Sequence, residues 1–191
     1  MGFSRAELEA FRGKSLPDLL GDDVRLLFVG INPGLLTAAV QAHFGRKGNR
    51  FYPALYRAGI VDRLIDASHG FAEEDRQHLL DRGVGITNLV RGATARADEL
   101  TTAELVTGAT SLTRRVRRIT PNVVAMLGIT AYRTAFARPR AVAGRQPEDL
   151  GGTPLWVVPN PSGLNAHATL DPLAAAYREV AVAAGIDVLT P

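Results

Sequence analysis

Four short runs of apolar and β-branched residues are distributed along the chain, and segments with a helical pattern separate them. The runs lie at residues 25–30, 84–90, 122–128 and 154–158. None alternates cleanly between apolar and polar positions, which is typical of strands that are covered on both faces in a parallel sheet. We therefore predict four strands of a short parallel sheet.

Helical patterns occupy residues 50–58, 73–81, 101–118, 129–137 and 172–184. Thr101 and Glu104 have the spacing of a capping box, and Asp171 before Pro172 predicts an N-cap followed by the first helical position. Residues 137–152, rich in Pro, Gly and Arg, are predicted to form a long surface connection. The alternation of strands and helices predicts the α/β class, with a single domain at residues 24–191 after an N-terminal segment at residues 1–23.

Composition limits the possible classes of protein. With 191 residues, 46% hydrophobic and 21% charged, the chain is long enough for one domain with a full core. It has no apolar stretch of about 20 residues and no signal-like start, so we expect a cytoplasmic protein without a membrane partner. The absence of cysteine excludes disulfides, thiol catalysis and thiolate-bound metals, and four scattered histidines favour no metal site.

The basic residues would suit an anionic partner, and a compositional bias of the source organism explains them at least as well. The net charge is +3, and all basic residues except Lys14 and Lys47 are arginines, which bind phosphate bidentately. The arginine run at residues 114–118 is interpreted as a solvated helix end, away from any cleft.

Two strand-like runs end in nearly the same turn, "INPGL" at residues 31–35 and "PNPSGL" at residues 159–164. In open parallel sheets ligands bind at the carboxyl ends of strands, so both turns are predicted to face one cleft. The end of the second run adds polar side chains to the same rim, namely Asn88, Arg91, Arg96 and Asp98.

The residue types suggest roles in this cleft. Asn32 is held by Pro33, and its carboxamide can position a ligand or a water but cannot act as a base near neutral pH. Phe44 lies in a glycine-flanked loop among basic residues, as in sites that stack a base, whereas Phe51 fits the core face of a helix. In the second turn, Ser162 can hold a phosphate and the exposed Leu164 can enter a base stack.

The motifs "GINPGL", "NRF" and "NPSGL" resemble those of the mismatch-specific uracil-DNA glycosylases, relatives of thymine-DNA glycosylase in the uracil-DNA glycosylase superfamily. The likeness extends over about residues 24–177. It implies a three-layer αβα sandwich around a four-stranded, mainly parallel sheet. It also implies a cofactor-free enzyme that flips uracil out of G·U mismatches in double-stranded DNA and hydrolyses its glycosidic bond. We expect a monomer, because one enzyme acting on one lesion needs no symmetry.

The resemblance also implies roles for single residues. Asn32 would hold the hydrolytic water, and Phe44 would stack on the flipped base. The remaining base contacts would come from Ile31, Gly34 and Asn160, and the DNA contacts from Ser162, Gly163, Leu164 and Asn165.

Three positions depart from the family pattern. Family members often continue the second turn as Leu-Ser-Arg, where this chain has Leu164, Asn165 and Ala166. Asn88 stands where some members have Lys. Asp98 stands where some have Asn, and it is either a second catalytic group that shares the water or a surface acid at a helix entrance.

Gly34 replaces the bulky Tyr of uracil-only relatives. It therefore predicts room for larger lesions, such as exocyclic cytosine adducts. Two alternatives stay open. One is a related glycosylase that prefers single-stranded or A·U substrates, and the other is a non-catalytic domain that binds damaged DNA or a nucleotide.

Overall fold

The fold is built on a five-stranded sheet. A computed structural model describes residues 2–163 and 169–190. The parallel strands β1 (Leu26–Gly30), β2 (Val84–Asn88), β3 (Val123–Leu127) and β5 (Leu155–Val158) lie in the order β2-β1-β3-β5, and β4 (Gly144–Arg145) pairs antiparallel with β5 at the edge. The predicted four-stranded sheet is thus corrected to a mixed sheet of five. β4 has only two residues and no apolar run, so no periodic signal marks it within residues 137–152.

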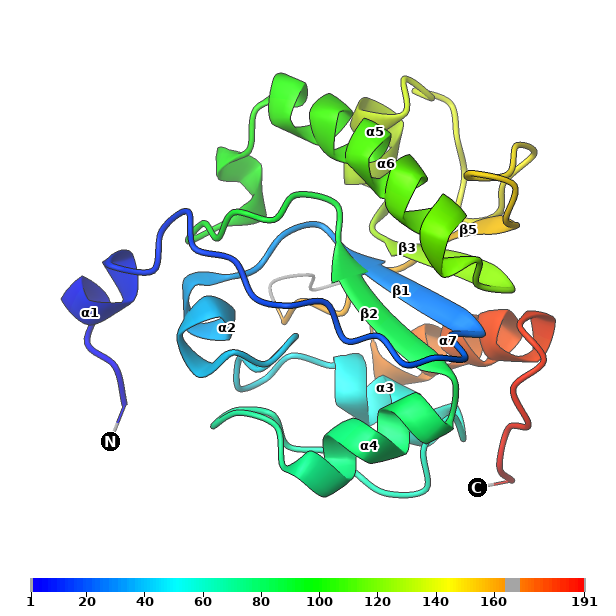
Figure 1. Cartoon of the computed structure of the whole chain (residues 1–191), viewed down its shortest axis with the longest axis horizontal. Coiled ribbons are helices and arrows are strands. Elements are labelled where there is room, and N and C mark those ends of the chain that lie inside the picture. Colours follow the sequence, from blue (N-terminus) through cyan, green and yellow to red (C-terminus); the bar gives the residue numbers. More distant parts are fainter. Residues whose placement is uncertain (1, 164–168, 191) are drawn as a thin grey trace.

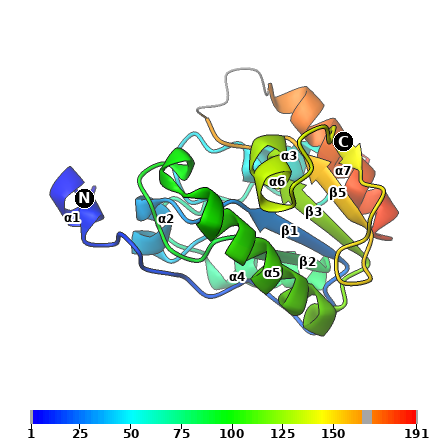
Figure 2. The same ribbon diagram turned by 90° about the horizontal axis from the view of Figure 1, so that it is seen from above.

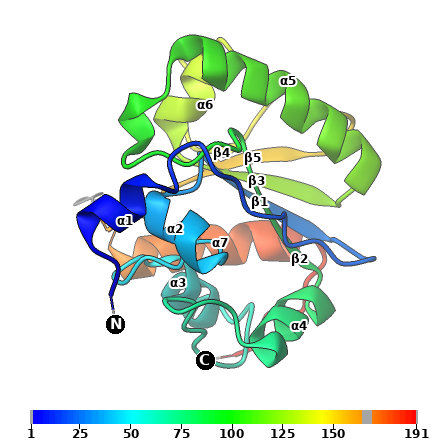
Figure 3. The same ribbon diagram turned by 60° about the vertical axis from the view of Figure 1, so that its left-hand side comes forward.

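Helices cover both faces of the sheet. On one face lie α5 (Thr102–Ile119) and α6 (Ile129–Ala135), and on the other α3 (Phe51–Arg57), α4 (Glu73–Asp81) and α7 (Leu170–Ala183) (Figures 1 and 3). Figure 2 shows α5 and α6 over the sheet on the side of the viewer. This arrangement confirms the three-layer αβα sandwich.

Alternation along β1 divides the core in two. Phe28 points to the side of α3 and α7, where its ring centroid lies 5.2 Å from those of Phe51 and Tyr177. Leu27 and Val29 point to the side of α5. Successive side chains of a strand point to opposite faces, so a strand with two covered faces has the continuous apolar sequence observed.

The predicted helices are present with one shifted start. The capping box of Thr101 and Glu104 forms, with both reciprocal hydrogen bonds. The N-cap of α7 is Thr169, so Asp171 and Pro172 lie within its first turn rather than at its cap and first position. Three further elements, which are all short, were not predicted from the sequence: α1 (Arg5–Glu9), α2 (Leu35–Val40) and the 3-10 turn η1 (Ala97–Glu99). α2 begins directly after the first Asn-Pro turn, with Gly34 as its N-cap.

One arginine of the basic run is buried, which corrects its interpretation as a solvated helix end. The side chain of Arg115 is 5% exposed and donates hydrogen bonds to Thr87 Oγ1 and, at 2.7 Å, to the Asn88 carbonyl. Helical periodicity places it on the same side of α5 as the buried Leu112 and Val116. Arg115 therefore supports the carboxyl end of β2, beside the cleft.

In residues 2–163 and 169–190, no helix is both long and apolar enough to cross a bilayer.

Candidate active site

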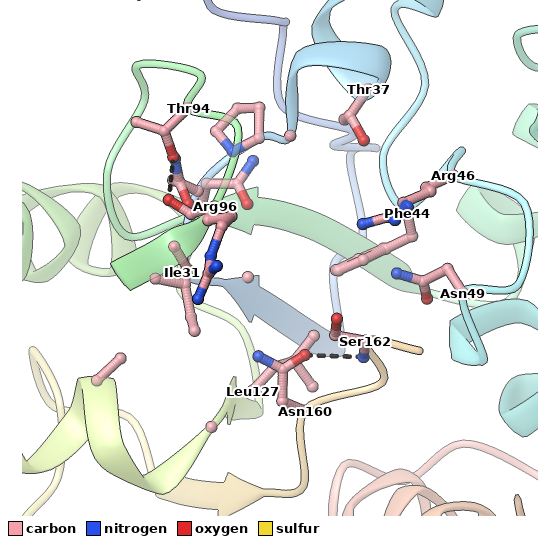
Figure 4. Close-up of a pocket in the computed structure, with 18 of the residues that line it drawn as sticks. Ile31, Thr37, Phe44, Arg46, Asn49, Thr94, Arg96, Leu127, Asn160 and Ser162 are labelled. Carbon is pink, nitrogen blue, oxygen red and sulfur yellow. Dashed lines mark hydrogen bonds between the residues drawn. The ribbon is translucent and has the colours of Figure 1, made fainter. Parts of the chain in front are cut away.

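A pocket of about 710 Å³ opens at the carboxyl ends of the parallel strands. Its walls include both Asn-Pro turns, which confirms that the two turns face one cleft. Figure 4 shows side chains from both turns and from the Phe44 loop around this pocket. The residues that line the pocket include Ile31, Asn32, Gly34, Phe44, Asn88, Asp98, Asn160 and Ser162.

The carboxamide of Asn32 has a defined orientation. Its Nδ2 donates to the Gly92 carbonyl at 3.0 Å and to Thr94 Oγ1 at 2.8 Å. The Thr94 hydroxyl donates onward to the Arg96 carbonyl at 2.7 Å (Figure 4). A carbonyl oxygen can only accept, and the Thr94 hydroxyl hydrogen is already used, so the NH₂ group of Asn32 must face this loop. In the described part of the chain nothing donates to Asn32 Oδ1, and this oxygen is left as an acceptor for a ligand.

Asn88 is a second oriented carboxamide. His43 is buried, and its Nε2 lies 2.9 Å from the Pro17 carbonyl while its Nδ1 lies 3.4 Å from Asn88 Nδ2. Burial lowers the pKa of the His43 imidazole. The ring is therefore neutral, donates to Pro17 through Nε2 and accepts from Asn88 through Nδ1.

The oxygen of Asn88 consequently points toward the end of β1. A Cβ atom on Gly30 would lie only 2.5 Å from Asn88 Oδ1, so a larger residue there would displace the Asn88 side chain from this orientation. Asn88 was predicted at the rim, but its role as an oriented acceptor was not. The apolar residues around Asn88 gave no signal that a buried histidine would orient its amide.

Phe44 provides an aromatic wall. Its ring stacks on Phe51 with centroids 4.0 Å apart and a 26° interplanar angle, and it is half-buried, whereas Phe51 is fully buried, as predicted. Phe44 has a left-handed backbone conformation with φ of 55°, which is unfavourable for a bulky side chain. The loop thus holds the ring at the pocket despite local strain.

The second turn is closed on itself and tied to the "NRF" segment. Asn160 Oδ1 accepts a hydrogen bond from the Ser162 amide at 2.9 Å (Figure 4). Arg50 donates from its backbone amide to the Pro161 carbonyl at 3.0 Å and from Nη2 to the Gly163 carbonyl at 3.4 Å. Two of the predicted DNA-contacting residues, Leu164 and Asn165, lie outside the described residues.

Residues 17–181 match the family model of the uracil DNA glycosylase superfamily. The chain belongs to this superfamily. A solved structure of a candidate uracil DNA glycosylase from Methanosarcina acetivorans, determined by solution NMR, is 15% identical with a TM-score of 0.60 and covers 92% of this chain and 98% of its own. At this identity the likeness shows the fold alone. Superfamily membership supports uracil excision in DNA repair as the activity and DNA as the partner.

Gly34 leaves open space in this glycosylase fold. Its φ of −74° is accessible to any residue, and a Cβ atom there would meet nothing closer than Thr37 Oγ1 at 4.0 Å. The backbone does not require glycine, so the effect of Gly34 is to widen the pocket. Ile31, which precedes the turn, is half-buried in the same wall.

Two charged residues of the predicted rim are paired with other charged side chains. Asp98 lines the pocket, but its side chain is 62% exposed and paired with Arg96, with Oδ2 2.5 Å from Nη2. Arg91 does not line the pocket, which corrects its predicted place at the rim. Its Nη2 lies 2.8 Å from Asp18 Oδ2. The sequence does not predict either ion pair, because both pairs depend on how the loops fold.

No group of three or more histidine, aspartate or glutamate side chains with the geometry of a metal site occurs among the described residues.

Proposed function

We propose that this protein is a DNA glycosylase that flips uracil out of a G·U mismatch in double-stranded DNA and hydrolyses its N-glycosidic bond, leaving an abasic site. The observation that carries the proposal is the orientation of Asn32. Both of its amide hydrogens are held by the loop at residues 92–94, and its oxygen remains as an acceptor beside an aromatic-lined pocket.

This geometry suits a reaction that needs positioning more than basicity. Breaking the C1′–N1 bond sends the electron pair to the pyrimidine and leaves an oxocarbenium-like sugar, which water attacks readily. Asn32 Oδ1 would accept one hydrogen of that water and direct its oxygen toward C1′. The new bond is C1′–O, and the proton of the water passes to solvent or to a nearby base.

The base would lie against Phe44, with its polar edge toward Asn88. Asn88 Oδ1 is an acceptor held in place by His43, and uracil carries a ring N–H at N3 that can donate to it. Stacking on an aromatic ring is worth about 1–3 kcal/mol per base. Ile31, Gly34 and Asn160 would complete the base site, and Ser162 with residues 163–165 would contact the DNA.

Preference for mismatches would follow from the cost of flipping. Extruding a base costs a few kcal/mol, and the cost falls when the pair is already mismatched. A G·U pair would therefore be favoured over A·U without a contact to the opposite base. The space at Gly34 would also admit ring-extended cytosine adducts.

A role for Asp98 as a second catalytic group would require its carboxylate to leave Arg96 and share the water with Asn32. General base catalysis contributes roughly 10²- to 10⁴-fold. We would measure single-turnover cleavage by Asp98→Asn. A rate equal to that of the wild type would make Asp98 a surface acid at the entrance to α5.

The proposal is tested by release of free base from a duplex with one G·U pair, compared with A·U, single-stranded uracil and G·T. We expect the fastest release from G·U. Faster release from single strands or A·U would assign the protein to another branch of the superfamily, and binding of the duplex without base release would make it a non-catalytic binder.

A further inference from the structure

An N-terminal strap, defined as residues 11–19, runs along the edge of the site. It follows α1 and lies alongside α2 and β2 before the chain enters β1 (Figures 1 and 3). The family match begins only at residue 17, so most of the strap lies outside it. Its hydrogen bonds nevertheless reach the groups that orient both carboxamides of the pocket.

The first set of contacts holds the partners of Asn32. Gly13 donates from its amide to the Ala93 carbonyl at 2.8 Å, and Ala93 donates from its amide to the Lys14 carbonyl at 2.9 Å. Ala93 stands between Gly92 and Thr94, the two acceptors of the Asn32 amide. The strap therefore fixes the loop that fixes the catalytic oxygen.

The apolar side of the strap supports the same loop. Phe11 of the strap, together with Leu8 of α1, packs against a small buried cluster of Leu35, Ala38 and Ala93. Leu35 and Ala38 belong to α2, which begins at the first Asn-Pro turn. The N-terminal residues therefore contact both the turn that carries Asn32 and the loop that accepts the hydrogen bonds of its amide.

The second set of contacts holds Asn88. The Pro17 carbonyl accepts from His43 Nε2 and thereby selects the tautomer whose Nδ1 accepts from Asn88. The next residue, Asp18, accepts from Thr87 Oγ1 at 2.8 Å, one position before Asn88. Leu19 then pairs with Ile86 through two backbone hydrogen bonds of 2.9 and 2.8 Å.

The charges around Asp18 reinforce this end of β2. Its carboxylate lies 2.8 Å from Arg91 and 3.8 Å from the buried Arg115, and its side chain is only 12% exposed. Arg115 in turn donates to the Asn88 carbonyl. Asp18 of the strap therefore compensates the charge of Arg115, which donates a hydrogen bond to the Asn88 backbone.

We infer that the strap is a positioning element for catalysis, which sets the orientation of the Asn32 and Asn88 carboxamides. A carboxamide turned by 180° exchanges its acceptor for a donor, so a loosened partner loop would present the wrong group to water. Loss of the contacts made by the strap should lower the rate of the chemical step more than the affinity for DNA. The kinetic consequence rests on the proposed function, whereas the effect on the two amides does not.

Gly13→Val is a suitable variant in the full chain. Gly13 has φ of +74°, which a β-branched residue rarely adopts, and its Cβ would meet nothing within 4 Å. The substitution therefore acts through backbone strain at the bond to Ala93. Gly152→Val is the matched control, because Gly152 has φ of +92°, an equally open Cβ position and a place in the turn before β5, outside the pocket.

We expect both variants to lose a similar amount of thermal stability. Well below either melting temperature, Gly13→Val should lower the single-turnover rate on G·U duplex roughly 10- to 100-fold, the range for a small misplacement of a catalytic group, with little change in DNA affinity. Gly152→Val should keep the wild-type rate. Equal rates for the two variants would overturn the inference.

Two further measurements separate positioning from general damage. In an Asn32→Ala background, Gly13→Val should add little further loss, because the step through which it acts is already gone. NMR should show that the Asn32 side-chain NH₂ signals exchange slowly in the wild type and quickly in Gly13→Val. Additive losses, or unchanged exchange, would contradict the inference. If the wild type releases no base, the proposed function fails, and the exchange measurement still decides the role of the strap.

Discussion

The two Asn-Pro turns differ in the atom of asparagine that they use. In the first, Asn32 donates both amide hydrogens to a distant loop and keeps its oxygen available. In the second, Asn160 uses its oxygen within its own turn, where it accepts from the Ser162 amide. Nearly the same sequence therefore leaves an acceptor oxygen facing the pocket at one strand end and forms a loop closed on itself at the other.

The largest expected effect comes from removing the first of these amides. Asn32→Ala should lower single-turnover excision from a G·U duplex roughly 10²- to 10³-fold, the usual loss for one preorganised polar group. DNA affinity should stay within about twofold, because the amide contacts water rather than DNA in this proposal. If Asn32→Ala kept a rate near that of the wild type, the amide of the first turn would have no catalytic role, and the proposed difference between the two turns would be wrong.

The glycines of the two turns provide the next comparison. A Cβ on Gly34 would face open space, whereas one on Gly163 would lie 3.0 Å from the Gly48 carbonyl. Gly34→Tyr should therefore fold normally and lose excision of ring-extended adducts by roughly 100-fold, the upper end for exclusion by pocket size, while it still excises uracil. Relative single-turnover rates on the two lesions measure this, with Gly34→Ala as the milder control. Equal losses on both lesions would contradict the steric argument.

Asn160→Ala should have a smaller effect on excision than Asn32→Ala. It removes the acceptor of the Ser162 amide in the second turn, and such a hydrogen bond is worth about 0.5–1.5 kcal/mol. We therefore expect at most about a tenfold loss, mainly as weaker binding. Fluorescence titration with abasic-site duplex would measure the binding. Asn160→Ser retains a side-chain acceptor and should recover part of the loss. A loss as large as that of Asn32→Ala would show that both turns carry catalytic amides.

The smallest expected effect is a pH dependence of stability. The unfolded His43 takes up a proton below its ordinary pKa of 6.5, whereas burial lowers the pKa in the folded protein. The unfolding free energy should therefore fall from pH 6.5 toward pH 5, by at most about 1.4 kcal/mol per pH unit for one proton. Above pH 6.5 the stabilising contribution of the neutral His43 should be complete. His43→Gln should show a shallower dependence in thermal melts. If the stability of the wild type and of His43→Gln depended on pH in the same way, the proton would bind to a group other than His43.

The sequence predicted the features that depend on local pattern. Apolar runs marked the four parallel strands, and the Thr101 capping box marked the start of α5. Because parallel strands share one carboxyl edge, the position of Asn32 and Asn160 at a common pocket also followed. Short elements such as α1, α2 and β4 have too few residues for a periodic signal.

The tertiary structure decided which atoms face the pocket. Asn32 meets partners 60 and 62 residues away, and Asn88 is oriented by His43, 45 residues away. Arg115 likewise becomes a support for β2 only because α5 packs over that strand. The sequence determines which groups stand at the edge of the sheet. The donor or acceptor character that each presents depends on hydrogen bonds between distant segments, and these form only when the chain is folded.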